Sequence, residues 1–157
     1  MPSAFSAIKG EKNMQYNELE KLGERVSRLG FGCMRFPTTP EGGIDEPRAE
    51  AMLDSAYRAG VNYFDTAYFY HQHTGEAFVG RMMKKYPRDS FKLATKMPMS
   101  IVTSLDQAKE IFEGQLAALQ TEYVDFYLFH ALNGERWEQA KAMGIVGYLE
   151  EQQRAGR

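Results

Sequence analysis

The sequence predicts an α/β fold in which a β-hairpin is followed by four strand–helix (βα) units. Short apolar, aromatic or β-branched runs alternate with segments that place apolar residues at helical spacing, a pattern typical of a parallel sheet covered by helices. The predicted strands end at Met34, Asp65, Lys96 and His130, and these positions are separated by 31, 31 and 34 residues. This regular spacing indicates repeated βα units.

The hairpin and the first unit have clear boundary signals. We predict the hairpin over residues 16–27, with its turn around Gly23. The first parallel strand is predicted over residues 29–34. Its helix begins after Asp45, whose side chain can cap the first turn, and it ends at Gly60.

The other three units repeat this order. We predict strands over residues 61–65, 91–96 and 123–130, and helices over residues 75–85, 104–119, 135–142 and 145–154. The helix at 104 begins with the capping-box pattern Ser104-x-x-Gln107. Right-handed crossovers place all four strand ends at one edge of the sheet, which is the edge where α/β proteins build their sites.

A closed βα barrel needs eight such units and about 250 residues. The chain has 157 residues, so we predict the N-terminal half of a (β/α)8 TIM barrel over residues 14–157. We interpret residues 1–13 as a disordered leader without the apolar core of a signal peptide. The two outer strands of a half-barrel expose unpaired edges and the barrel interior lies open, which predicts self-association.

Composition excludes several classes of protein. The formal net charge is −2 and no run of Lys and Arg exceeds two residues, which argues against a nucleic-acid surface. No apolar run approaches the roughly 20 residues needed to span a bilayer. The single cysteine, Cys33, excludes an internal disulfide, and a reducing, cytoplasmic location fits best.

Four reactive side chains are predicted to meet at the carboxyl edge of the sheet. Asp65, Lys96 and His130 each end an apolar strand, and Tyr70 follows Asp65 by five residues. An Asp and a Lys on adjacent strands can pair, and the ammonium would favour the ionised form of a nearby tyrosine, which suits proton donation. Tyr68 is the competing tyrosine, and the five-residue offset selects Tyr70.

Each of these residues also has an ordinary structural interpretation. Asp65 could cap a turn, Lys96 could be a solvated strand end, and His130 could be a hydrogen-bonded core histidine. Their joint spacing favours a site over these interpretations. His71 and His73 form a His-x-His pair, but no third ligand accompanies them, so we predict a solvated loop and no metal site.

Four motifs resemble the aldo-keto reductase family. Residues 65–70 match its Asp-Thr-Ala-x-x-Tyr motif, Thr95-Lys96 matches its lysine, and residues 127–130 resemble its Tyr-Leu-x-His. Residues 29–36 resemble the first strand of a bacterial and archaeal, oxidoreductase-like branch of the family. The resemblance covers about residues 14–157, with the motifs in the family's order and spacing.

The resemblance implies an NAD(P)H-dependent oxidoreductase that reduces a small aldehyde or ketone to an alcohol without a metal. Tyr70 would be the general acid, Lys96 paired with Asp65 would tune it, and His130 would orient the carbonyl. The residues near the nicotinamide ribose would be Gly32, Cys33, Met34, Arg35 and Asp65.

In the family, most contacts to NADPH or NADH come from later strands and loops. The resemblance therefore implies a partial chain that is inactive alone. Two alternatives stay open at this point. One is a natural half-barrel that completes itself by dimerising, and the other is a non-enzymatic binding or regulatory module on the same scaffold.

Overall fold

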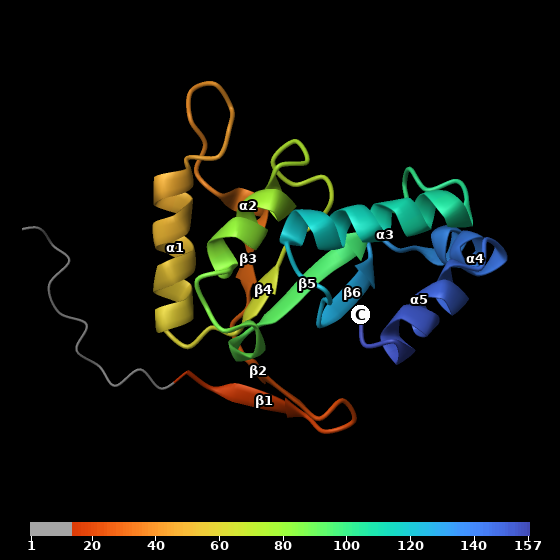
Figure 1. Cartoon of the computed structure of the whole chain (residues 1–157), viewed down its shortest axis with the longest axis horizontal. Coiled ribbons are helices and arrows are strands. Elements are labelled where there is room, and N and C mark those ends of the chain that lie inside the picture. The colour runs from red at the N-terminus through yellow and green to blue at the C-terminus, as the bar shows by residue number, and fades with distance from the viewer. Residues whose placement is uncertain (1–13) are drawn as a thin grey trace, which may run out of the picture.

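A computed structural model describes residues 14–157, and the expected leader, residues 1–13, lies outside them. The chain forms a two-stranded antiparallel hairpin and a four-stranded parallel sheet with strand order β3-β4-β5-β6 (Figure 1). The strands are β1 (Tyr16–Leu19), β2 (Glu24–Ser27), β3 (Phe31–Gly32), β4 (Tyr63–Asp65), β5 (Lys92–Met97) and β6 (Phe126–Phe129). The helices are η1 (Cys33–Arg35), α1 (Glu46–Arg58), α2 (Gly75–Met83), η2 (Arg88–Ser90), α3 (Leu105–Leu119), α4 (Gly134–Ala142) and α5 (Ile145–Arg154). The predicted α/β order of a hairpin and four βα units is confirmed.

Three strands are shorter than the sequence predicts, and the second of them, expected over residues 61–65, is observed as β4. The first, expected over residues 29–34, is only the two-residue β3, because the 3₁₀ turn η1 begins directly after it. The last, expected over residues 123–130, is shortened to β6. Before β6, the side chains of Arg88 and Thr121 donate hydrogen bonds to the carbonyl oxygen of Tyr123. This oxygen therefore has side-chain partners instead of a partner in a neighbouring strand.

The helix boundaries follow the sequence signals with one difference. Asp45 accepts a hydrogen bond from the first turn of α1, and Gly60 follows the helix with φ of +91°, which favours glycine. Ser104 Oγ accepts from Gln107 N at 3.2 Å, as the capping box predicts. The Gln107 side chain, however, accepts from Thr103 N, one residue earlier than the reciprocal bond of a capping box.

The sheet has one covered face and one open face. Helices α2 and α3 lie across one face of the sheet (Figure 1). Phe64, Leu93 and Met97, whose side chains lie on this face, are buried. The alternate positions point the other way, and Leu128 of β6 is 39% exposed. In a complete barrel this second face would be the interior.

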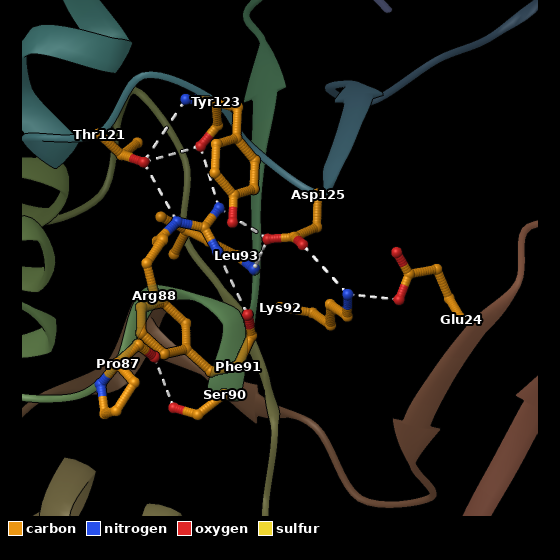
Figure 2. Close-up of polar contacts among 10 residues, drawn as sticks. All are labelled: Glu24, Pro87, Arg88, Ser90, Phe91, Lys92, Leu93, Thr121, Tyr123 and Asp125. Carbon is orange, nitrogen blue, oxygen red and sulfur yellow. Dashed lines mark hydrogen bonds and ion pairs between the residues drawn. The ribbon is translucent and has the colours of Figure 1, made fainter. Parts of the chain in front are cut away.

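A network of charged side chains ties the hairpin to the amino ends of the strands (Figure 2). Asp125 has a side chain only 7% exposed and accepts from Arg88 Nη2 at 2.7 Å and from Leu93 N at 2.8 Å. Lys92 Nζ lies 3.4 Å from the other Asp125 oxygen and also pairs with Glu24 of β2. The network therefore connects η2, β5, β6 and the hairpin on the side of the sheet opposite the strand ends that carry the predicted site.

Candidate active site

The carboxyl edge of the sheet brings the four predicted catalytic side chains together. Asp65 is the last residue of β4 and pairs in register with Ala94 of β5, so Lys96 lies two residues further on the same face. His130 follows β6, and its N–H donates to the Met97 carbonyl oxygen at 2.8 Å. Tyr70 lies in the loop after β4.

The Lys96 ammonium is the centre of this cluster. Its Nζ donates to Asp65 Oδ1 at 2.6 Å, to the Thr66 carbonyl oxygen at 2.7 Å and to the Tyr70 hydroxyl oxygen at 3.3 Å. An ammonium has three N–H donors, so these contacts use all of them. Because Lys96 donates to the phenolic oxygen, the proton of Tyr70 stays free to be given to another acceptor.

His130 stands beside Tyr70, with ring centroids 6.0 Å apart and planes at 86°. Burial, then the charge of Lys96, lowers the pKa of His130, although Asp65 opposes this effect. The neutral form of the ring is therefore favoured. Its Nδ1 atom is buried and has no hydrogen-bond partner among residues 14–157. Since an unpaired buried N–H is costly, the tautomer with the proton on Nε2 is favoured.

The loop after Tyr70 has an unusual backbone. His71, Gln72 and His73 have φ values of 51°, 54° and 68°, three consecutive left-handed residues without a glycine. His71 Nε2 lies 3.1 Å from the Cys33 carbonyl oxygen, and its ring stacks on Phe36 with centroids 5.4 Å apart. The prediction of a solvated loop is thus wrong for His71, which is half-buried against η1, whereas His73 is exposed.

The described residues show neither a metal cluster nor a membrane span. Within residues 14–157, no group of three His, Cys, Asp or Glu side chains is placed to hold a metal ion. No helix in the same part of the chain is long and apolar enough to cross a membrane.

The residues expected near the cofactor form the turn from β3 into η1. Gly32 pairs with Asp65, and a Cβ added at Gly32 would meet no atom within 4 Å, so the backbone there is open. Met34 and Arg35 are exposed. Cys33 is fully buried, and burial, then the charge of Asp65, raises the pKa of its thiol. The expectation for Cys33 is therefore wrong, because the whole residue is buried and its carbonyl oxygen contacts His71, whereas Gly32, Met34 and Arg35 present an open surface.

Two features of the site escaped the sequence prediction. The first is the Thr66 carbonyl oxygen that accepts from Lys96, which no sequence signal reveals because every residue has a carbonyl. The second is Glu76, a buried carboxyl in the first turn of α2 that hydrogen-bonds Thr95 and Gln115. A signal for Glu76 does exist, since it is an acidic residue within an otherwise small and apolar run.

Known proteins resemble this chain in sequence. Residues 28–157 match the Aldo/keto reductase family. The chain is 30% identical over 131 residues to probable aldo-keto reductase 1 of Glycine max, covering 78% of this chain and 38% of that protein. It is 32% identical over 125 residues to the aldo-keto reductase YhdN of Bacillus subtilis (strain 168), covering 74% of this chain and 38% of that protein.

Solved structures that resemble this chain belong to the same family as its sequence relatives. The chain aligns with the holo form of the aldo-keto reductase AKR11C1 from Bacillus halodurans with a TM-score of 0.64 and 32% identity, covering 85% of this chain and 47% of that chain. The chain thus spans less than half the length of these relatives. Its four βα units form a partial (β/α)8 barrel, and the chain belongs to the aldo-keto reductase family.

Proposed function

We propose that this chain carries the proton-transfer machinery of an NAD(P)H-dependent reductase that converts an aldehyde or ketone to an alcohol. One observation supports this most strongly. The Lys96 ammonium is fixed by Asp65 and by the Thr66 carbonyl oxygen, and its remaining N–H is directed at the Tyr70 hydroxyl oxygen. This arrangement would stabilise negative charge on that oxygen when the tyrosine gives up its proton.

Each side chain has a role in the proposed reaction. NADPH or NADH, when bound, would supply the hydride that reaches the carbonyl carbon. Tyr70 would transfer its phenolic proton to the carbonyl oxygen, and Lys96 would hold the tyrosinate until solvent returns a proton. His130 would donate from Nε2 to the same carbonyl oxygen and so orient the substrate. Asp65 would balance the charge of Lys96 throughout.

The turn from β3 into η1 fits one end of such a cofactor. Gly32, Met34 and Arg35 would border the nicotinamide ribose together with Asp65, whereas Cys33 lies fully buried beneath this surface. The open backbone at Gly32 supports this assignment, because a flat group could approach it closely. The proposal needs no metal, because Tyr70 gives the proton and the nicotinamide gives the hydride.

We also propose that the 157-residue chain is inactive alone and that its partners are a small carbonyl compound and a second barrel half. The open sheet face and the outer strands β3 and β6 support self-association. The net charge of −2 argues against nucleic acid as a partner, and the cysteine usage is consistent with the cytoplasm. The presence of all four reactive side chains in contact range favours an enzyme over a non-enzymatic binding module.

The test is to complete the barrel. A fusion joins residues 14–157 to the part of Bacillus halodurans AKR11C1 that the alignment leaves uncovered. We expect oxidation of NADPH or NADH that depends on an added aldehyde or ketone. A folded fusion that binds the cofactor but reduces no carbonyl compound would overturn the proposed function.

A further inference from the structure

A buried carboxyl lies directly behind the candidate site. Glu76 is 5% exposed and accepts hydrogen bonds from Thr95 Oγ1 and from Gln115 Nε2, the latter at 2.7 Å. Gln115 Nε2 also lies 3.0 Å from the Lys96 carbonyl oxygen, to which it donates. Tyr127 donates to Gln115 Oε1 at 2.5 Å. Glu76 therefore connects α2 to β5 and α3 next to the residue that carries the ammonium.

The same turn of α2 also contacts the proton donor. The Gly75 N–H donates to the Tyr70 carbonyl oxygen at 3.1 Å. A Cβ added at Gly75 would lie 3.0 Å from that oxygen and 3.2 Å from Tyr70 Cβ, so the helix start packs directly against Tyr70. Adjacent residues of α2 thus contact the two parts of the site, Gly75 on the Tyr70 side and Glu76 on the Lys96 side.

Burying this carboxyl costs free energy. Burial raises the pKa of Glu76, and the hydrogen bonds from Thr95 and Gln115 and the charge of Lys96 only partly oppose that rise. An apolar side chain of similar size could fill the space without such a cost. An apolar side chain could not, however, make a directed hydrogen bond to β5 or α3. Such hydrogen bonds hold α2 in a defined position relative to Lys96.

We infer that Glu76 is a positioning residue, which fixes the spacing between the Tyr70 hydroxyl and the Lys96 ammonium by joining α2 to Thr95 and Gln115. The inference rests on the proposed function only for the role of this spacing in proton transfer. The spacing itself is a property of the folded chain, so it can be measured without a cofactor or turnover.

The experiment follows Tyr70 in the full chain labelled with ¹³Cζ-tyrosine. The Tyr70 resonance is assigned as the signal lost in Tyr70→Phe. Lys96→Met should shift this resonance in the wild type, because the ammonium lies against the phenolic oxygen. In the Glu76→Leu background the shift caused by Lys96→Met should fall by at least half.

Two matched variants serve as controls for Glu76→Leu. Glu76→Gln keeps an oxygen that accepts from Thr95 and Gln115, so it should retain the full effect of Lys96→Met. Glu110→Leu changes an exposed glutamate of α3 and should also retain it. A folded Glu76→Leu protein that keeps the full Lys96 effect would overturn the inference.

Should Glu76→Leu fail to fold, Thr95→Val and Gln115→Met remove the two partners one at a time. A reduced Lys96 effect in either variant supports the inference, and a full effect in both overturns it. The outcome is separable from the proposed function. Loss of the Lys96 effect in Glu76→Leu, together with a completed barrel that reduces no carbonyl, would reject the function and keep the positioning role.

Discussion

The Nζ atom of Lys96 lies 3.3 Å from the Tyr70 hydroxyl oxygen, while Asp65 and the Thr66 carbonyl oxygen hold its other two N–H bonds. The lysine side chain is only 13% exposed, so this contact is largely shielded from water. A shielded ammonium thus faces the Tyr70 phenol, whereas the hydroxyls of Tyr16, Tyr57 and Tyr127 donate to uncharged groups and that of Tyr86 donates to a carboxylate.

Replacing Tyr70 by Phe in the completed barrel should slow carbonyl reduction by at least about 100-fold, because general acids contribute roughly 10²–10⁴-fold. The affinity for the cofactor should hardly change, since the phenol is not among the groups expected to bind the dinucleotide. Steady-state rates and cofactor titration measure both quantities. The control is Tyr68→Phe, which should be nearly silent, because that ring packs against His73 rather than against Lys96. Near-full turnover in Tyr70→Phe with a loss in Tyr68→Phe would show that the motif register is wrong.

The 157-residue chain alone should bind NADPH only weakly. Its expected contacts are confined to Gly32, Met34, Arg35 and Asp65, which would border one end of the cofactor. We expect a Kd above about 10 μM, equivalent to roughly −7 kcal/mol. Titration followed by cofactor fluorescence measures this value. Saturable binding tighter than that limit would mean that four βα units suffice to hold the dinucleotide.

The isolated chain should also self-associate. β3 and β6 each have one unpaired edge in the parallel sheet, and the face that carries Leu128 is open. A dimer that joins β6 of one copy to β3 of the other on both sides would pair both edges and cover the open face. Sedimentation should reveal dimers or larger species. A concentration-independent monomer with cooperative melting would contradict this prediction.

Removing Asp125 should strongly destabilise the domain. Its buried carboxylate pairs with Arg88 and Lys92 and accepts from the backbone of β5. Asp125→Ala would leave both cations without this partner, a change that costs about 3–5 kcal/mol for buried pairs. Urea unfolding gives the free energy of unfolding directly. Asp106→Ala is the control, because that side chain is 91% exposed and should change stability by less than about 0.5 kcal/mol.

Glu76→Gln should become more stable relative to the wild type as pH rises. Burial raises the pKa of Glu76 above its usual 4.5, against the opposing effects of Thr95, Gln115, Lys96 and His73. From pH 4.5 up to that raised pKa, the folded state binds more protons than the unfolded state, so the wild type loses stability with rising pH. The glutamine variant cannot titrate there. Urea unfolding of both proteins from pH 4 to 8 gives their free energies of unfolding. The difference between the variant and the wild type should be constant below pH 4.5 and should grow in favour of the variant above it. If the wild type instead became more stable relative to the variant as pH rises, the assignment of a raised pKa to Glu76 would be contradicted.

Sequence periodicity was sufficient to predict the order of elements, because each amphipathic helix and each apolar strand has a distinct repeat. It also located Asp65, Lys96 and His130, since strand ends in parallel sheets share one edge. The extent of β3 could not be predicted, because the turn that replaces its second half depends on contacts from His71, which is far away in sequence. The Glu76 contacts were hidden for the same reason, since their partners lie 19 and 39 residues further along the chain.

The left-handed run from His71 to His73 has a consequence for protein engineering. Each such residue costs roughly 1–2 kcal/mol relative to a right-handed one, and no glycine in this run offsets that cost. Contacts of His71 with Cys33 and Phe36, more than 30 residues earlier, hold the shape. The transplantable unit is therefore two separate segments, the turn at 32–36 and the loop at 65–76. Grafting the Asp-Thr-Ala-x-x-Tyr stretch by itself into a foreign barrel would move the side chains without the conformation that aims them.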